Sequence, residues 1–406
     1  MKAPSAMHRR LSHSLSRRAG LVLAATLTLA ATTSFVGPGL SPAVGEAPAG
    51  LPPVPAGGEL GFLVDRFTLP LIPGLEPCPD GLAPTVREAY VKQLDPVERE
   101  RLLRAENEEE LTRRWKAWTA GPGGANICTN PDMFPDRPLI PTVRHPLAWG
   151  MDLDGGKTED GCAHEEFTDP RGQTGIDNQE YRVMGCWPTF RGTDGNGGEV
   201  QQGYRQFFSS GEWTQVLIIR GIDSLVRDDD VTVIYANTPD RPVADSTGRF
   251  LAGASFTISD APPRNRNVLK ARIVNGVLET EPQDIVLTQT WGQGGARDIR
   301  GNRTKFTFHK GRLRLTFNPD GTVSGMLGGY RPLFEIIQSP ALGGSGSATV
   351  AGIDCASQLA TLRKMADGIR DPQTGQCTAV SSAVQIGAIP AFVNDVPVAR
   401  QGRATR

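Results

Sequence analysis

The chain has 406 residues, 38% of them hydrophobic, which is enough to bury a core in one large domain or two ordinary ones. Its 47 glycines and 32 prolines favour short strands and turns over long helices. Basic and acidic residues number 43 and 44, and removal of the basic N-terminus described next would leave an acidic chain, which excludes nucleic acid as a partner class.

The N-terminus has the pattern of an export signal. Arginines without any acidic residue precede the apolar run 21–36, and the small residues Ala43 and Gly45 follow it. We therefore expect a signal peptide at 1–45 and an exported mature chain, periplasmic or extracellular, without a transmembrane helix. A transmembrane helix is the alternative, but Thr and Ser interrupt a run that is short for a membrane span.

The next two segments are expected to be a linker and a helical segment. Residues 46–58 are rich in Pro, Gly and Ala, which predicts a linker. Within 59–148 we expect an edge strand at 62–72 and then a helix at 95–119, because Asp95 and the proline after it suit an N-cap and a first turn. The apolar stripe of this helix has helical spacing and consists of Leu111, Trp115 and Trp118.

Residues 149–200 form a polar stretch in which acidic side chains predict a metal site. Asp152 and Asp154 stand at i and i+2, an arrangement of oxygen ligands that suits Ca²⁺. The segment does not match an EF-hand loop, since Lys157 stands where that loop has glycine and Ala163 where it has glutamate. Ca²⁺ is the only cofactor that these residues suggest, and the sequence favours the other interpretation, acidic turn residues that bond to the backbone.

The same stretch carries the candidate ligand-binding side chains. Carboxylate, amide and aromatic groups together suit recognition of sugar hydroxyls, although such residues also cap turns and fill cores. The candidates are His164, Glu166, Asp177, Asn178, Gln179, Tyr181 and Arg182. The chain contains no nucleophile elbow, zinc-protease, P-loop or dinucleotide-binding motif, so we assign no catalytic residue.

Residues 201–340 have the clearest strand signals. Short β-rich runs alternate with tight turns, above all at Asn275-Gly276 and Lys310-Gly311, each of which predicts a hairpin. This pattern predicts a mainly β fold, namely an antiparallel β-sandwich of jelly-roll or lectin-like type. Basic residues concentrated at 297–314 give this part a surface for an anionic polymer of the cell envelope, or simply a polar outer sheet face.

The cysteines and the C-terminal part complete the prediction. Residues 341–395 are expected to form a disulfide-stapled helix, loop and strand, with Asp354 as the helix N-cap, and 396–406 a flexible tail. Six cysteines in an exported chain favour disulfides, and they allow about 15 connectivities. We favour the pairs closest in sequence, which are Cys78 with Cys128, Cys162 with Cys186 and Cys355 with Cys377.

One segment resembles known proteins. Residues 162–167 (Cys-Ala-His-Glu-Glu-Phe) and 175–186 (Gly-Ile-Asp-Asn-Gln-Glu-Tyr-Arg-Val-Met-Gly-Cys) are similar to a segment of an uncharacterised family of exported bacterial proteins. No activity is attached to that family. The resemblance therefore implies a structural unit and export, and assigns no role to any residue.

Three functions remain open at this point. The first hypothesis is non-catalytic binding of a carbohydrate or an anionic envelope component through the loops around 152–190. A glycan-acting hydrolase that uses carboxylates of 164–180 is the second, and a purely structural envelope protein is the third. The oligomeric state is not predicted.

Overall fold

The computed structural model describes residues 50–156, 162, 164–192, 197–258, 266–288, 305–337 and 352–395. All of them belong to one compact unit. The predicted signal peptide, the predicted tail and the basic segment 297–304 lie outside the described residues. Among the residues within these ranges, no helix has both the length and the hydrophobicity that a membrane span needs.

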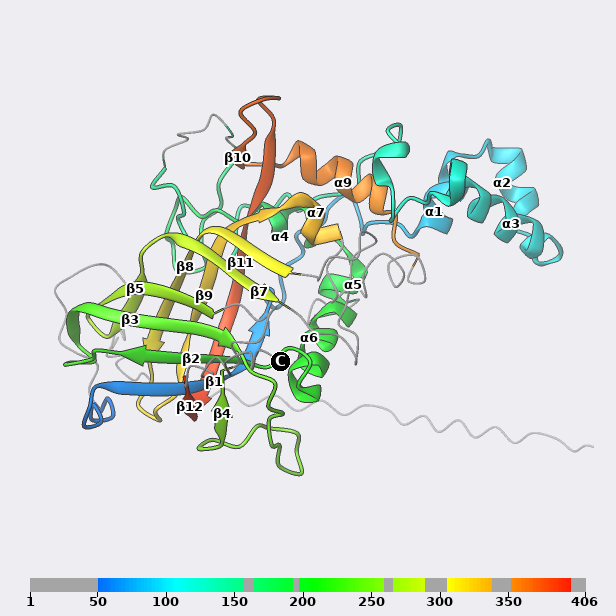
Figure 1. The fold of residues 1–406 in the computed structure, drawn as a ribbon. Helices are drawn as coiled ribbons and strands as arrows, with labels where there is room; N and C mark the ends of the chain where they lie inside the picture. The colour runs from blue at the N-terminus through cyan, green and yellow to red at the C-terminus, as the bar shows by residue number, and fades with distance from the viewer. Residues whose placement is uncertain are drawn as a thin grey trace, which may run out of the picture. The chain divides into compact units, whose positions relative to one another are not determined.

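The main sheet closes on itself (Figure 1). Its antiparallel neighbours follow the order β1, β2, β3, β5, β6, β8, β9 and β11, and β11 pairs back to β1, which gives an eight-stranded barrel. The strands are β1 (Glu59–Thr68), β2 (Gln215–Arg220), β3 (Arg227–Asn237), β5 (Arg266–Val274), β6 (Val277–Thr280), β8 (Lys305–Phe317), β9 (Val323–Pro332) and β11 (Cys377–Pro390). Additional strands are β7 (Gln283–Thr288), paired with β8, and β10 (Gly368–Arg370), paired with β11.

The predicted sandwich is therefore wrong. A sandwich needs two sheets with free edges, whereas β1 pairs with β2 on one side and with β11 on the other, from Phe62 opposite Pro390 to Thr68 opposite Gln385. The predicted edge strand at 62–72 is for the same reason an interior strand of the closed sheet. Alternation of apolar and polar residues arises equally in a sandwich and in a barrel, because either buries one face of each strand.

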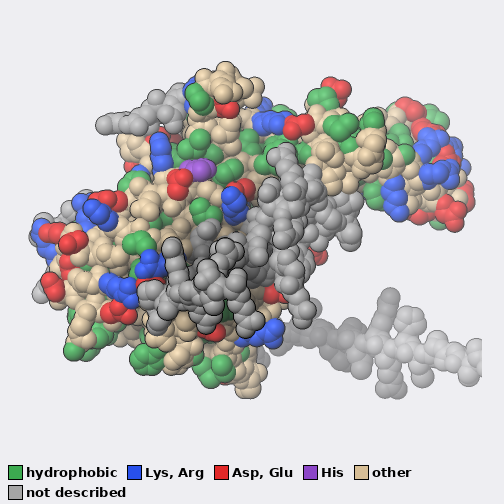
Figure 2. Space-filling model, viewed as in Figure 1, with side chains coloured by type: hydrophobic (Ala, Val, Ile, Leu, Met, Phe, Trp, Pro, Cys, Tyr) green, Lys and Arg blue, Asp and Glu red, His purple; other side chains and the backbone are tan. Residues whose placement is uncertain are grey.

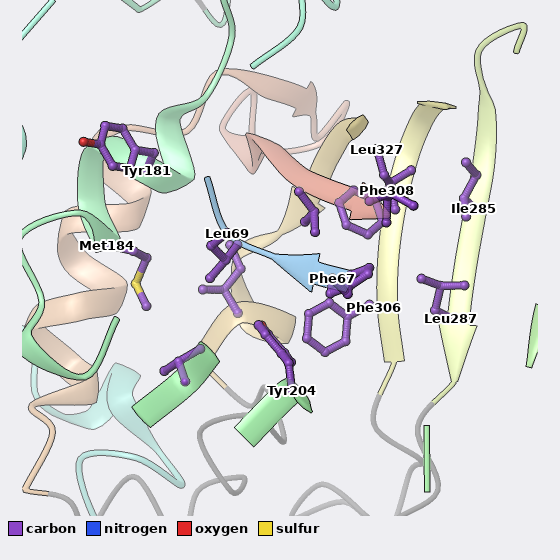
Figure 3. Close-up of a cluster of buried hydrophobic side chains, with 14 of the residues drawn as sticks. Phe67, Leu69, Tyr181, Met184, Tyr204, Ile285, Leu287, Phe306, Phe308 and Leu327 are labelled. Atoms are coloured by element: carbon purple, nitrogen blue, oxygen red, sulfur yellow. The ribbon is translucent and has the colours of Figure 1, made fainter. Parts of the chain in front are cut away.

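The core fills the barrel and extends under the helices beside it. On β5, buried Leu269, Ala271 and Ile273 alternate with exposed residues, so one face of the strand lines the interior. A second, smaller core lies outside the barrel, where the parallel pair β4 (Ser255–Thr257) and β12 (Phe392–Asn394) covers β1 to β3. Figure 3 shows part of the main core, with side chains from the helices and from β1, β7 and β8.

The helices are short, and several differ from the predictions. They are α1 (Val86–Gln93), α2 (Pro96–Leu102), α3 (Glu108–Trp118), α4 (Gln179–Met184), α5 (Pro188–Arg191), α6 (Glu199–Ser210), α7 (Leu333–Ile337) and α9 (Cys355–Lys364), with 3₁₀ turns η1 (Ala105–Asn107), η2 (Pro122–Gly124) and η3 (Pro131–Met133). The single helix predicted at 95–119 is two helices, because the chain turns through η1. Asp95 and Asp354 do cap α2 and α9 as predicted.

Charged side chains stabilise the pair α2 and α3. Arg101 and Arg114 each contact both Glu98 and Glu110, at N–O distances of 2.6 to 2.8 Å. Figure 2 shows acidic and basic side chains intermixed over this part of the surface. Such exposed pairs contribute little each, so the segment depends mainly on the small core of Tyr90, Leu102 and Leu111.

Two predicted hairpins have different outcomes. The Asn275-Gly276 hairpin is confirmed, since both residues have positive φ (53° and 77°) between β5 and β6. The Lys310-Gly311 hairpin is wrong, because β8 runs through both residues as one strand. Lys310 has a φ of 50° there, and the pairing with β9 shifts between His309 and Arg312, which is a bulge and not a turn.

All six cysteines form disulfides, as predicted, but the favoured pairing is wrong. The bonds are Cys78–Cys186, Cys128–Cys355 and Cys162–Cys377. Each joins residues more than 100 positions apart, with separations of 108, 227 and 215. Closeness in sequence is a poor guide here because barrel closure brings the two ends of the described chain together.

Candidate metal centre

The site begins with a loop on the outer face of the barrel. Met151 and Leu153 are buried against Tyr330 of β9 and Ala379 of β11. Gly328 of β9 makes room for them, since a Cβ there would lie 2.9 Å from the sulfur of Met151. Because Met151 and Leu153 point into this contact, the intervening Asp152 and the following Asp154 stay half-buried at the surface.

A second segment brings Asp177 to this loop. The Asp177 backbone N–H donates to the carbonyl of Met151 at 3.0 Å, and its side-chain Oδ2 accepts from the Leu153 N–H at 2.7 Å. Gly150 allows the close approach, since a Cβ would lie 2.5 Å from Ile176. As a result, Asp152, Asp154 and Asp177 each offer a carboxylate oxygen, all within 4.8 Å of one another.

In the turn after Asp152, one oxygen of each of two carboxylates accepts a backbone hydrogen bond. Asp152 Oδ1 accepts from the N–H of Gly155 at 2.6 Å, and Asp154 Oδ1 accepts from the N–H of Gly156 at 2.7 Å. Both glycines have positive φ, 71° and 68°, which favours glycine. Each bond involves one of the two oxygens of its carboxylate, so turn capping and ion binding are compatible.

Negative charge accumulates in the site. Burial raises the pKa of Asp177 to about 7, and the charges of Asp154, Asp367 and Asp152 add to this effect, while the hydrogen bond from Leu153 opposes it. Burial also raises the pKa of Asp367 to about 6. The pKa of Tyr330 is raised by burial and by the carboxylates of Asp177, Asp367 and Asp154.

Arg312 offsets part of this charge. Its guanidinium donates to the backbone carbonyl of Asp152 at 3.2 Å and to that of Leu153. These bonds hold the loop from the β8 side, and among the residues that the structure describes Arg312 makes no hydrogen bond to a carboxylate. Arg312 therefore fixes the loop while the carboxylates remain available to a cation.

Glu166 is a further acidic group beside this loop. Its Oε2 and Asp152 Oδ2 lie 3.7 and 3.8 Å from the position that a Cβ on Gly175 would take. Gly175 has a φ of 75° and leaves this space open between the two side chains. Glu166 is exposed, so it can move toward an ion bound at Asp152.

The other candidate residues lie beside the cluster and bond within the protein. Asn178 caps α4 and donates to the carbonyl of Trp149 at 2.7 Å. Gln179 and Arg182 both donate to the carbonyl of Glu165, at 2.9 and 2.7 Å. Tyr181 is 3% exposed, and burial raises its pKa to about 12. Gln179 and Arg182, together with the ring contact of Tyr181 with Phe167, hold the 164–167 segment against α4, while Asn178 holds Trp149.

His164 is half-buried on the far side of this segment. Burial and the nearby charge of Arg182 lower its pKa, and a hydrogen bond with the Ala366 backbone opposes that shift. It is not part of the carboxylate cluster formed by the described residues. The structure thus brings Asp152, Asp154 and Asp177 together, places Glu166 beside Asp152, and leaves His164 apart.

Three residues of the site were missed by the sequence analysis, namely Asp367, Tyr330 and Arg312. Asp367 follows α9 and accepts from the N–H and the hydroxyl of Ser381, both at 2.6 Å. Nothing in the local sequence marks these residues, because their roles depend on the pairing of β8, β9 and β11. The long-range disulfide Cys162–Cys377 was the one signal that could have placed β11 beside this stretch.

Comparisons with known proteins assign no function to this site. No protein-family model matches the chain, and neither the curated proteins nor the solved structures contain a significant match.

Proposed function

We propose that the protein is an exported, non-catalytic binding protein that takes up Ca²⁺ at Asp152, Asp154 and Asp177 and binds a carbohydrate of the cell envelope through that ion. The supporting observation is the group of three carboxylate oxygens within 4.8 Å of one another. Two oxygens bound to one Ca²⁺ at about 2.4 Å lie at most about 4.8 Å apart, so the spacing of these oxygens is compatible with a shared ion.

The electrostatics favour a cation over an empty acidic turn. Asp177 is 6% exposed and surrounded by the negative charges of Asp154, Asp367 and Asp152. A buried carboxylate with like-charged neighbours is costly unless a positive charge compensates it. Ca²⁺ suits the site better than Zn²⁺ because every candidate ligand is an oxygen.

The geometry leaves room for a ligand on the ion. Three monodentate carboxylates fill about half of the 6 to 8 oxygen positions that Ca²⁺ prefers. Asp152 and Asp154 are half-buried and Glu166 is exposed, so the open positions would face solvent. Adjacent hydroxyls of a sugar supply pairs of neutral oxygens, which is why we propose a carbohydrate as the partner.

A glycan-acting hydrolase is the second candidate, favoured by the raised pKa of Asp177, which suits a general acid near neutral pH. The distances argue against it. Glycosidase carboxyl groups stand about 5 to 10 Å apart with the scissile bond between them, whereas these oxygens lie within 4.8 Å. That spacing suits a shared ion better than a cleaved bond.

The test is thermal unfolding of the oxidised mature protein in Ca²⁺ and in EDTA. We expect a dose-dependent rise of the midpoint in Ca²⁺ that the Asp152→Asn/Asp154→Asn variant loses. Asp229→Asn/Asp230→Asn is the matched control, because both residues are exposed acidic neighbours on β3, away from the cluster.

A glycan array probed in Ca²⁺ and in EDTA then tests the partner. Binding that requires Ca²⁺ and disappears in the Asp152→Asn/Asp154→Asn variant supports the proposal. A midpoint that does not respond to millimolar Ca²⁺ contradicts the ion site, and glycan binding that persists in EDTA contradicts the role of the ion.

A further inference from the structure

A second buried polar group lies inside the barrel, on the opposite face of β9. Leu327 of β9 belongs to the main core, and Arg331, four residues later, points to the same side. Arg331 is 1% exposed, although an arginine almost never lies so deep without full pairing. Its position in the interior is therefore unusual and requires compensation by its neighbours.

Glu180 of α4 provides only part of that compensation. Arg331 Nη1 donates to Glu180 Oε1 at 2.6 Å, with side-chain exposures of 1% and 4%. Arg331 Nε and Nη2, and Glu180 Oε2, have no hydrogen-bond partner among the described residues. Such unmatched buried groups are costly, and Nε with Nη2 is the edge of a guanidinium that binds two oxygens side by side.

Two neighbouring side chains also have polar atoms without a hydrogen-bond partner among the described residues. Val380 on β11 is the cross-strand partner of Arg331, and Ser382, two residues further, faces the same interior side. The hydroxyl of Ser382 has no partner among the described residues, nor does Oε1 of Gln358. Gln358 reaches α4 through Met184, one turn after Glu180, at 3.1 Å. Unmatched donors and acceptors are therefore gathered where α4 meets the barrel.

The surroundings of this polar group are apolar. The guanidinium carbon of Arg331 lies 4.4 Å from the ring centre of Phe306 and 5.8 Å from that of Phe308. Figure 3 shows both phenylalanines on β8 and Met184 on α4, within the same core. An eight-stranded barrel is wide enough either for side chains alone or for one small ligand.

We infer that the end of the barrel beneath α4 binds a small molecule with a carboxyl head and a hydrocarbon body. The carboxyl oxygens accept hydrogen bonds from Arg331 Nε and Nη2, and its O–H donates to Glu180 Oε2. The hydrocarbon part packs against Phe306, Phe308 and Met184. Because Arg331 and Glu180 already neutralise each other, the acid binds in its protonated form, which adds no third charge to the interior.

The experiment titrates the oxidised full chain with carboxyl-¹³C octanoic acid at pH 7 and follows the ¹³C signal. We expect saturable binding, with a bound shift typical of the protonated acid although the free ligand is ionised. The Arg331→Met/Glu180→Met variant removes both charges, which often preserves folding, and should bind at least tenfold more weakly. Its thermal transition and circular dichroism verify that it is folded.

The matched control is Arg220→Met/Glu59→Met, a surface pair with the same 2.6 Å contact. This control should bind octanoic acid like the unchanged protein. Three outcomes overturn the inference: no saturable binding, equal affinity in the Arg331→Met/Glu180→Met variant, or a bound signal with the shift of an ionised carboxylate. The first would leave buried water as the partner of these groups.

Discussion

Tyr330 and Arg331 are neighbours on β9, yet they face two regions in which charge is balanced differently. Arg331 faces inward, where Glu180 of the same chain neutralises it at 2.6 Å. Tyr330 faces outward to Asp177 and Asp367; burial raises its pKa, and these carboxylates raise it further. The inner region carries opposite charges in equal number and the outer region carries an excess of one sign. The protein supplies the counter-charge inside, whereas outside, under the function proposed above, a Ca²⁺ ion from solution would supply it.

The largest expected effect comes from breaking the inner pair. Arg331→Met leaves the buried carboxylate of Glu180 without its partner, which should cost about 3 to 5 kcal/mol of unfolding free energy. Chemical denaturation of the single variant and of Arg331→Met/Glu180→Met measures this. The double variant should recover most of the loss. If the single variant were as stable as the double one, the inner region would not depend on internal pairing.

Removal of disulfides separates the outer region from the rest of the fold. Cys162→Ser/Cys377→Ser frees the stretch that follows the Asp152 loop from β11, and Cys128→Ser/Cys355→Ser is the control, with a similar separation of 227 against 215 residues. Each should lower stability by about 2 to 4 kcal/mol. Only the first should weaken Ca²⁺ binding, by about tenfold in a calorimetric titration. An equal loss of affinity in both would contradict a local role.

Asp177→Asn tests the excess charge directly. An amide of the same shape can still accept from the Leu153 N–H, while it removes a buried negative charge. In EDTA at pH 8 the variant should be more stable than the unchanged protein by about 1 to 2 kcal/mol, because no charge is buried at this position and the repulsion with Asp154 and Asp152 is relieved. In Ca²⁺ the order should reverse. A variant that is less stable under both conditions would show that the protein itself compensates this carboxylate.

The smallest expected effect concerns Asp395, a carboxylate that the protein itself pairs with arginines, and it serves as the reference for Asp177. Hydrogen bonds and charges from Arg266 and Arg220 lower the pKa of Asp395. The stability that the ionised Asp395 carboxylate contributes is therefore fully present above its unfolded pKa near 3.8. It is lost as the pH falls through the lower pKa of the folded state. Asp395→Asn should cost less than about 1 kcal/mol at pH 7, and this cost should shrink as the pH falls below the unfolded pKa. Urea denaturation from pH 7 downward measures it, and a cost that does not shrink with falling pH would argue for a packing effect instead.

The sequence predicted the local features of the fold well. Asn275-Gly276, Asp95 and Asp354 act through residues within a few positions, so their patterns determine the turn and the caps directly. The missed helix α6 also had a local signal, since Val200, Tyr204, Phe207 and Phe208 are buried at helical spacing. This helix signal was not recognised because the region was interpreted as a run of strands without intervening helices.

Long-range features could not be predicted in the same way. Whether a sheet closes depends on the pairing of β1 with β11, and no local pattern encodes a contact between Phe62 and Pro390. The candidate site shows the same division. Asp152 and Asp154 were suggested by their spacing, whereas Asp367 joins the site only because β10 and β11 lie beside it.

The pairing of β1 with β11 has a consequence for how the molecule forms. The first strand has both of its partners far ahead in the chain, so it must wait for β2 and finally for β11 before its hydrogen bonds are complete. Contacts over such separations slow folding, because a long loop must close before they form. We therefore expect folding to begin in the β8–β9 hairpin and to finish with the arrival of β11, which also carries Cys377 to Cys162. A chain cut before Cys377 would present two open strand edges, and aggregation, not partial function, is the expected outcome.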